Sequence, residues 1–232
     1  MRSPFVRGMA HGVPIMLGYL SVSFGFGILA VRLGLPVLGA VAISATNLTS
    51  AGQAAGVEII AAGGTLLEMA LTQLVINLRY ALMGFSLSQK LDETFTTPHR
   101  LLVSFGITDE IYAVAISQPE RLTATYMLGL ILTPMLGWIT GTALGAAAGQ
   151  LLPAVVSDAM GIVLYGMFLA IIVPPSRKDK RVLLVVLLAA AVSCLFRYLL
   201  PAVSGGFAVI VSALAASVAG ALLCPVSEEA AA

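Results

Sequence analysis

The sequence predicts an all-α, polytopic membrane protein. Of its 232 residues, 59% are apolar and only 10% are charged, and the mean hydropathy is +1.02. Because a soluble domain carries about 25% charged residues, this composition excludes an ordinary soluble domain. A bilayer core about 30 Å thick takes roughly 20 apolar residues per helix, so the chain has room for roughly six to eight spans. Short polar gaps between the apolar runs indicate a single transmembrane domain over residues 1–232.

The first three apolar segments differ in kind. A span is expected over 11–31, where Pro14 and four glycines would let neighbouring backbones approach closely. The segment 37–64 is long enough to span, but polar residues interrupt its middle. Unsatisfied backbone at membrane depth is tolerated only inside protein or beside a water-filled cavity, so this segment fits a broken helix or a re-entrant pair of half-helices. A full span follows over 65–88.

The rest of the chain contains another anomaly and then a plain scaffold. Segment 101–117 is short, and Thr108, Asp109 and Glu110 lie at its centre. Four clean spans follow: 123–148, 158–174, 182–200 and 207–224. The predicted fold is therefore about six full spans plus two broken or re-entrant segments. Because polar residues at membrane depth gather before position 120, the function is expected there.

Lysine and arginine in short loops predict the orientation. The strongest cluster, SRKDKR at 176–181, is expected to be cytoplasmic, which also places both termini on that side. Lys90 and Arg100 share this side only if 37–64 and 101–117 do not cross the membrane fully. If both segments cross, eight spans result, with Lys90 and Arg100 outside, against the charge rule.

Composition and motifs argue against several other functions. The formal net charge is +1 and the cations are scattered, whereas nucleic-acid binding needs a concentrated basic patch. The two cysteines have no CxxC or Cys/His spacing, so no metal and no cofactor is expected. The sequence has no H-E-x-x-H, G-x-S-x-G or Walker motif, so neither an enzyme nor a built-in ATPase is indicated.

The stretch VINLRYALMG, 75–84, places a permanent cation inside an apolar helix. An arginine at mid-bilayer depth costs from about 2.5 to more than 10 kcal/mol, so a partner must compensate for Arg79. It can face a cavity and bind a substrate carboxylate, pair with an internal acid, or snorkel to the interface. Asn77 lies two residues away and points to another side of a helix, so it is expected to serve a different partner.

Four carboxylates are possible acid partners for that arginine. Asp109 and Glu110 are candidates for ion coupling, because a carboxylate at membrane depth can bind and release H⁺. Alternatively, they belong to a polar loop or a helix start, with Thr108 or Asp109 as the N-cap. Glu58, Glu68 and Thr108 are further possible site residues. Alternatively, the two glutamates flank a glycine pair near the outer interface, where an ionised carboxylate costs little.

Two amides complete the candidate set. Asn47 and Gln53 supply hydrogen-bond donors and acceptors without charge, which suits a polar solute or a junction of half-helices. The alternative is ordinary hydrogen bonding between helices. The expected substrate-binding residues are therefore Asn47, Gln53, Asn77 and Arg79.

Three motifs, in this order, resemble the AzlC family, the large subunit of bacterial branched-chain amino acid exporters. They are TSAGQA at 49–54, INLRYALMG at 76–84 and FGITDEIYAVA at 105–115. That family shows a G-A-x-Q-F-like stretch, then N-L-R-[HY]-x-L-[YM]-[GS], then T-D-E. Ser50 stands where a glycine or alanine is usual, and Ala54 replaces a phenylalanine. If that phenylalanine lines the substrate cavity in relatives, Ala54 widens the pocket here.

The resemblance implies a multi-pass protein of the bacterial inner membrane that works with a small AzlD-type membrane subunit. The predicted function is a secondary exporter of small aliphatic amino acids of the branched-chain type, proton-coupled through Asp109 or Glu110. The substrate carboxylate would meet Arg79 or the positive end of a half-helix. The alternative is a non-transporting membrane scaffold or assembly subunit, in which the buried polar residues only fix helix register.

Overall fold

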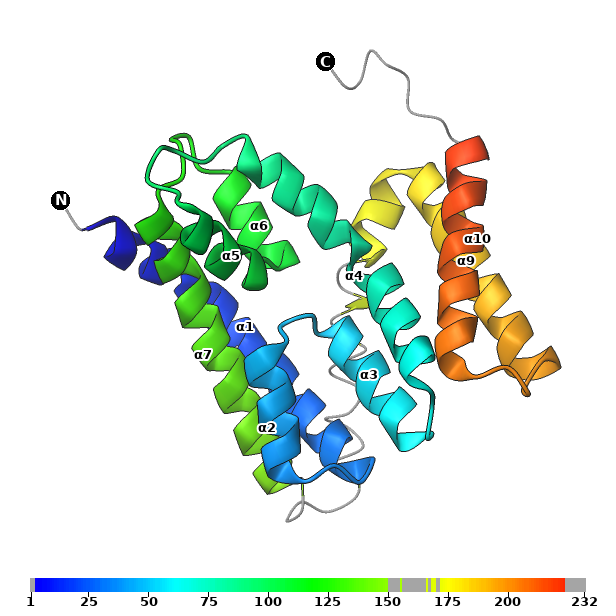
Figure 1. Cartoon of the computed structure of the whole chain (residues 1–232). Coiled ribbons are helices and arrows are strands. Elements are labelled where there is room, and N and C mark those ends of the chain that lie inside the picture. Colours follow the sequence, from blue (N-terminus) through cyan, green and yellow to red (C-terminus); the bar gives the residue numbers. More distant parts are fainter. Residues whose placement is uncertain (1–2, 150–154, 156–165, 167, 170–171, 224–232) are drawn as a thin grey trace.

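The computed structural model describes residues 3–149, 155, 166, 168–169 and 172–223. Within these ranges the chain is helical and forms no β-strand, apart from one isolated bridge between Leu91 and Leu122. The helices are α1 (Pro4–Arg32), α2 (Val37–Thr46), α3 (Ala51–Ala61), α4 (Leu66–Ser88), α5 (Thr97–Phe105), α6 (Asp109–Ile116), α7 (Ala124–Ala148), α9 (Lys180–Leu199) and α10 (Gly205–Leu223) (Figure 1).

Five of the described helices are long and apolar enough to cross a membrane, namely α1, α4, α7, α9 and α10. They correspond to five of the six predicted full spans, so the all-α, polytopic class is confirmed. Helix α1 begins earlier than the predicted start at residue 11, because Ser3 caps it and Pro4 suits its first turn. The sixth predicted span, 158–174, lies largely outside the described residues.

Helices α1 and α7 lie side by side along most of their length (Figure 1). Glycines make this contact possible, because a Cβ at Gly27 would collide with the carbonyl of Thr142, and a Cβ at Gly145 with the carbonyl of Phe24. Membrane helices pack through small residues in this way when their backbones must approach closely. The pair forms a stiff wall against which the shorter helices pack.

Both anomalous segments are broken helices. Helix α2 ends at Thr46 and α3 begins at Ala51, while α5 ends at Phe105 and α6 begins at Asp109. In Figure 1, α2 and α3 form a hairpin whose outer ends lie at the lower end of the molecule, and α5 and α6 form one whose outer ends lie at the upper end. The two predicted broken or re-entrant segments are therefore present as helical hairpins, and their outer ends lie at opposite ends of the molecule.

Polar side chains at the two tips, residues 47–50 and 106–108, explain why the helices break there. Asn47 Oδ1 accepts a hydrogen bond from the backbone N–H of Thr49 at 3.0 Å. Thr108 Oγ1 accepts one from the N–H of Ile111 at 3.4 Å and caps α6. Such bonds offer the backbone an alternative to helical pairing. The same polar residues that mark the anomalies in the sequence thus form the hairpin tips.

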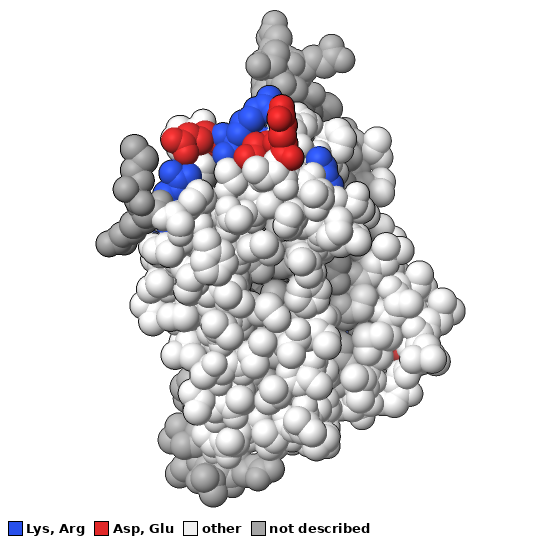
Figure 2. All heavy atoms as spheres, turned by 60° about the vertical axis from the view of Figure 1, so that its left-hand side comes forward, with Lys and Arg blue, Asp and Glu red and all other residues white. Residues whose placement is uncertain are grey.

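Charged side chains gather at one end of the molecule (Figure 2). In Figure 1 this charged end comprises the start of α1, the loops 89–96 and 117–123 with the first turn of α5, the segment 172–181, and the end of α10. Both described chain ends and the basic loops therefore lie together, as the interpretation with two partial crossings requires. That this end is cytoplasmic stays a prediction.

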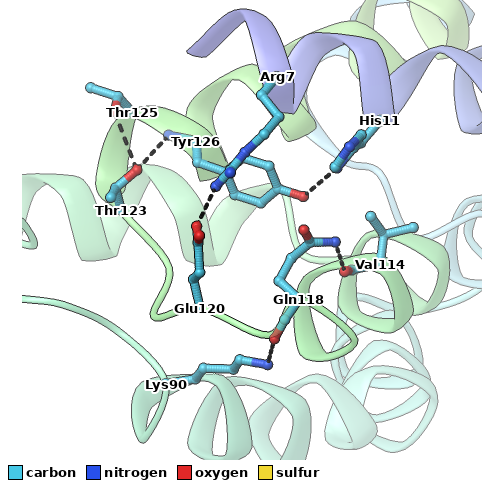
Figure 3. Close-up of polar contacts among 9 residues, drawn as sticks. All are labelled: Arg7, His11, Lys90, Val114, Gln118, Glu120, Thr123, Thr125 and Tyr126. Carbon is cyan, nitrogen blue, oxygen red and sulfur yellow. Dashed lines mark hydrogen bonds and ion pairs between the residues drawn. The ribbon is translucent and has the colours of Figure 1, made fainter. Parts of the chain in front are cut away.

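Two cations hold the loop 117–123 against its neighbours (Figure 3). Arg7 of α1 pairs with Glu120 at 3.1 Å. Lys90, which follows α4, donates hydrogen bonds to the carbonyls of Ile116 at 2.5 Å and of Gln118. A cation beside the carbonyls that end α6 also complements the negative end of that helix. The second hairpin is therefore anchored at the charged end, and its tip points toward the centre.

Candidate functional site

A cavity of about 520 Å³ lies where the two hairpin tips meet. We call it the central cavity. Leu48 and Ser50 from the first tip and Thr108 from the second line it, together with side chains of α1, α4, α7 and α10. Its volume falls in the range of about 300–1,000 Å³ that is typical of small-molecule sites.

An ion pair crosses this cavity from α4 to α6. Arg79 Nη1 lies 2.7 Å from Asp109 Oδ2, and the two side chains are 38% and 32% exposed. The Arg79 guanidinium also lies 5.1 Å from the centre of the Tyr80 ring. A charge-assisted bond and a ring face compensate for taking the cation out of water. Of the four carboxylates proposed as partners for Arg79, the structure selects Asp109.

A second polar cluster joins α1 to the tip of the second hairpin. The Tyr19 hydroxyl lies 2.5 Å from Glu110 Oε2 and 2.6 Å from Thr108 Oγ1. A phenol has one proton to donate, and a carboxylate can only accept. We therefore infer that the Tyr19 hydroxyl donates a hydrogen bond to Glu110 and accepts one from the Thr108 hydroxyl. The Tyr19 ring packs edge-to-face on Trp138 at 5.2 Å, which fixes its position against α7. Glu110 is thereby held at the cavity wall.

The two half-helices that begin at this cavity differ in charge. Asp109 and Glu110 occupy the first turn of α6, so α6 carries its own anions at its positive end. The first turn of α3 has no acid, and the Ser50 side chain makes no capping bond. Within the described residues the N–H of Ala51 has no hydrogen-bond partner, and Ser50 and Ala51 both line the cavity. The start of α3 is thus an open site for an anion.

The remaining walls of the central cavity are mostly apolar. The apolar lining includes Val75 and Ile76 of α4, Trp138 of α7 and Ala213 of α10. Trp138 is 1% exposed, and its indole N–H has no partner within the described chain. A cavity that combines charged groups with aliphatic and aromatic lining suits a small amphiphilic solute.

The predicted amides Gln53 and Asn77 do not line the central cavity but belong to hydrogen bonds that fix the helices around it. Asn77 Nδ2 donates to Gln73 Oε1 at 3.1 Å, and Gln73 Nε2 donates to the carbonyl of Gly52 at 2.7 Å, which ties α4 to α3. Gln53 Nε2 donates to Ser44 Oγ at 3.1 Å, which joins α3 to α2. Asn77 and Arg79 therefore serve different partners, as their spacing predicts.

The structure divides the predicted site residues into three groups. Arg79, Thr108, Asp109 and Glu110 meet in the central cavity. Asn47, Gln53 and Asn77 hold the first hairpin and its neighbours together. Glu58 and Glu68 line a different cavity. The role of each in binding or coupling stays a prediction.

Sequence reasoning missed part of the lining. Tyr19, Trp138 and Ala51 contribute to the central cavity, but an aromatic or alanine residue inside an apolar run looks like ordinary packing. The signal that could have found Ala51 is its place directly after the polar interruption, where a half-helix must begin.

The fold defines a polytopic helical membrane protein with a cavity between two half-helix hairpins. Residues 14–152 match the family model described as AzlC protein, so the chain belongs to the AzlC family. It is 28% identical over 205 residues to the inner membrane protein YgaZ of Escherichia coli (strain K12), covering 85% of this chain and 83% of that protein. It is 32% identical over 172 residues to an uncharacterized membrane protein of Archaeoglobus fulgidus, covering 73% and 75%.

No solved structure matches the chain. The family and the membrane proteins related to it support a role in membrane transport for a multi-pass membrane protein. The resemblance drawn from the three motifs is therefore confirmed.

Proposed function

We propose that this protein is a secondary transporter that exports small aliphatic amino acids of the branched-chain type, with proton coupling. The central cavity is the observation that carries this proposal. It combines an open helix N-terminus, two carboxylates and apolar walls in a space of about 520 Å³. These are the groups that the carboxylate, the ammonium and the aliphatic side chain of such an amino acid require.

The start of α3 is the better partner for the substrate carboxylate. Arg79 already pairs with Asp109, and a substrate carboxylate would have to displace that partner. The N–H of Ala51, in contrast, has no partner within the described chain. Broken helices in transporters bind anionic substrate groups through such N-terminal N–H groups and the positive helix end.

The two carboxylates of α6 then take separate roles. Glu110, held by Tyr19, is positioned to accept the ammonium of the substrate. Asp109 is the coupling acid, because a proton on Asp109 neutralises it and weakens its hold on Arg79. Proton uptake would thus change the contact between α4 and the second hairpin.

The proposal includes a small membrane partner of the AzlD type. Helix α9 buries none of its residues within the described chain, so its surface is available to such a subunit. We place the protein in the bacterial inner membrane with its charged end and both termini in the cytoplasm, on the charge rule.

Efflux of preloaded radiolabelled leucine, isoleucine, valine and methionine tests the proposal. Cells would carry the protein with its small partner, or the variants Arg79→Ala and Arg79→Lys at equal protein levels. We expect selective efflux that falls at least about tenfold in both variants, because neither alanine nor lysine places a planar guanidinium against both Asp109 and the Tyr80 ring. Arg181→Gln, at the exposed charged end, is the matched control and should export normally.

The scaffold alternative gives a different pattern. A scaffold would show no efflux of any of the four amino acids above that of cells without the protein, although the protein is folded and its partner is present. Efflux that is equal in the parent and in Arg79→Ala would contradict a role for the central cavity.

A further inference from the structure

A second cavity, of about 600 Å³, shares no lining residue with the central cavity. We call it the second cavity. The same three helices line both, since α3 contributes Ala51 to the central cavity and Ala55 to the second, and α10 contributes Ala213 and Gly206 respectively. The two cavities therefore follow one another along α3, α4 and α10. The second is lined by the end of α3 and the starts of α4 and α10, and these helix ends lie opposite the charged end (Figure 1).

Charge is concentrated at this second cavity. Away from the charged end and the central cavity, the described residues include four charged side chains, Arg32, Glu58, Glu68 and Arg197. Three of these four, Glu58, Glu68 and Arg197, line the second cavity. The acids come from α3 and α4 and the arginine from α9. A ligand there would meet carboxylates on one wall and a guanidinium on another.

Glu68 is a buried carboxylate that can accept more hydrogen bonds than it receives. It is 4% exposed, and its Oε1 accepts a hydrogen bond from the N–H of Gly206, at the start of α10, at 3.1 Å. Within the described chain its Oε2 has no hydrogen-bond partner, although a carboxylate can accept about four bonds. A buried charge requires pairing, and one N–H with the helix end supplies only part of it. An ammonium group would supply the missing hydrogen-bond donors and the opposite charge.

Arg197 supplies the complementary group. It lies in the last turn of α9, is exposed, and has no hydrogen bond or ion pair with any described residue. Its guanidinium can bind a carboxylate with two parallel hydrogen bonds. An acid wall and an arginine wall around one cavity match the ammonium and the carboxylate of a free amino acid.

We propose that the second cavity is a binding site for a zwitterionic amino acid, with its ammonium at Glu68 and its carboxylate at Arg197. The inference rests on the proposed function and adds a second site for the same solute, on its way out. The hydrogen bond from Gln73 to the carbonyl of Gly52 lies between the two cavities, because both residues fall between the lining positions on their helices. This bond between α3 and α4 separates the two sites until the solute passes.

Binding to the purified full chain in lipid nanodiscs tests the second site. Equilibrium binding of radiolabelled leucine, isoleucine, valine or methionine gives the number of sites. The protein has one tryptophan, Trp138, which lines the central cavity, so its fluorescence reports binding there and not in the second cavity. The wild type should bind two amino acids per chain, with one of them sensed by Trp138.

Two variants should remove one site only. Arg197→Gln and Glu68→Gln are expected to bind one amino acid per chain with an unchanged Trp138 titration. Glutamine at position 68 keeps an acceptor for the N–H of Gly206, so the start of α10 stays capped. Arg181→Gln makes the same change at the opposite end of α9 and should still bind two.

The outcomes separate the second site from the proposed function. One bound amino acid in the wild type, sensed by Trp138 and unaffected by Arg197→Gln, would overturn the second site and leave the proposed function standing. Loss of the Trp138 signal in Arg197→Gln would show that the two cavities are not separate sites. Absence of binding by all four amino acids in both measurements would remove the proposed function and this inference together.

Discussion

The two hairpins are built alike but present different helix ends to the same cavity. Each breaks at a polar tip and begins a second half-helix there, α3 after the first tip and α6 after the second. Helix α6 has a threonine cap and two acids in its first turn, whereas α3 has neither a side-chain cap nor an acid. The protein itself therefore neutralises the positive end of α6, whereas the start of α3 keeps a free backbone donor, where we propose that the substrate carboxylate binds.

Removing the acid that pairs with Arg79 across the cavity should reduce export most. Asp109→Asn leaves Arg79 without its partner beside the open end of α3 and removes the proposed coupling acid. We expect export to fall at least about tenfold, which corresponds to about 1.4 kcal/mol. The efflux assay at equal protein level measures it, with Asp92→Asn at the charged end as the control. Export within twofold of the parent would contradict the coupling role.

A smaller loss is expected when Glu110 loses the phenol that holds it. Tyr19→Phe keeps the ring on Trp138 but removes the 2.5 Å hydrogen bond to Glu110. Glu110 keeps its charge and its place on α6, and one hydrogen bond typically contributes about 0.5–1.5 kcal/mol net, so export should fall by about twofold to tenfold. Phenylalanine fills the same space, so abundance should not change. Unaltered export would show that the position of Glu110 is not needed for transport.

The two tips should differ in what their polar side chains contribute to stability. Thr108→Ala removes the cap of α6 and should lower the free energy of unfolding by about 1 kcal/mol. Ser50→Ala removes a side chain that makes no capping bond, so it should change this free energy by no more than a few tenths of a kcal/mol. Unfolding in mixed detergent micelles measures both. Equal losses would mean that the two tips are held in the same way.

A small gain in stability is expected at the tip of the first hairpin. Ser50 has a φ of +23°, a conformation that a residue with a Cβ rarely adopts. Ser50→Gly should therefore raise the free energy of unfolding by about 0.5–1 kcal/mol. The same unfolding measurement detects it, and Ser50→Ala serves as the control that keeps a Cβ. A loss of stability in Ser50→Gly would show that the serine hydroxyl matters more than the backbone conformation.

Much of the fold follows from local sequence. Apolar length predicts the five long helices, and the polar interruptions near Asn47 and Thr108 predict the breaks, because those side chains compete for backbone hydrogen bonds. The need of Arg79 for an acid was also predictable, but which acid was not. Four carboxylates qualified, and only the packing of α6 against α4 selects Asp109.

The rest depends on contacts between distant parts of the chain. Glu68 binds the N–H of Gly206, 138 residues away, and no local pattern indicates that pairing. Tyr19 and Trp138 reach the cavity because α1 and α7 pack through glycines, which turns two aromatic residues of apolar runs toward the tips. Tertiary packing determines which residues line a cavity. The sequence therefore predicts the charged residues of the central cavity but not the aromatic residues that line it.

Placing an acid in the first turn of α3, where α6 already has two, tests whether the substrate carboxylate binds at the start of α3. Ala51→Asp places a carboxylate in the first turn of α3 at the cavity wall, and Ala51→Asn is a neutral control of the same size. Leucine affinity is measured in nanodiscs by the fluorescence of Trp138. We expect aspartate to weaken binding at least about tenfold and asparagine to change it less than about threefold, because only the anion competes with the substrate carboxylate. Wild-type affinity in Ala51→Asp, or equal loss in both variants, would contradict carboxylate binding at the start of α3.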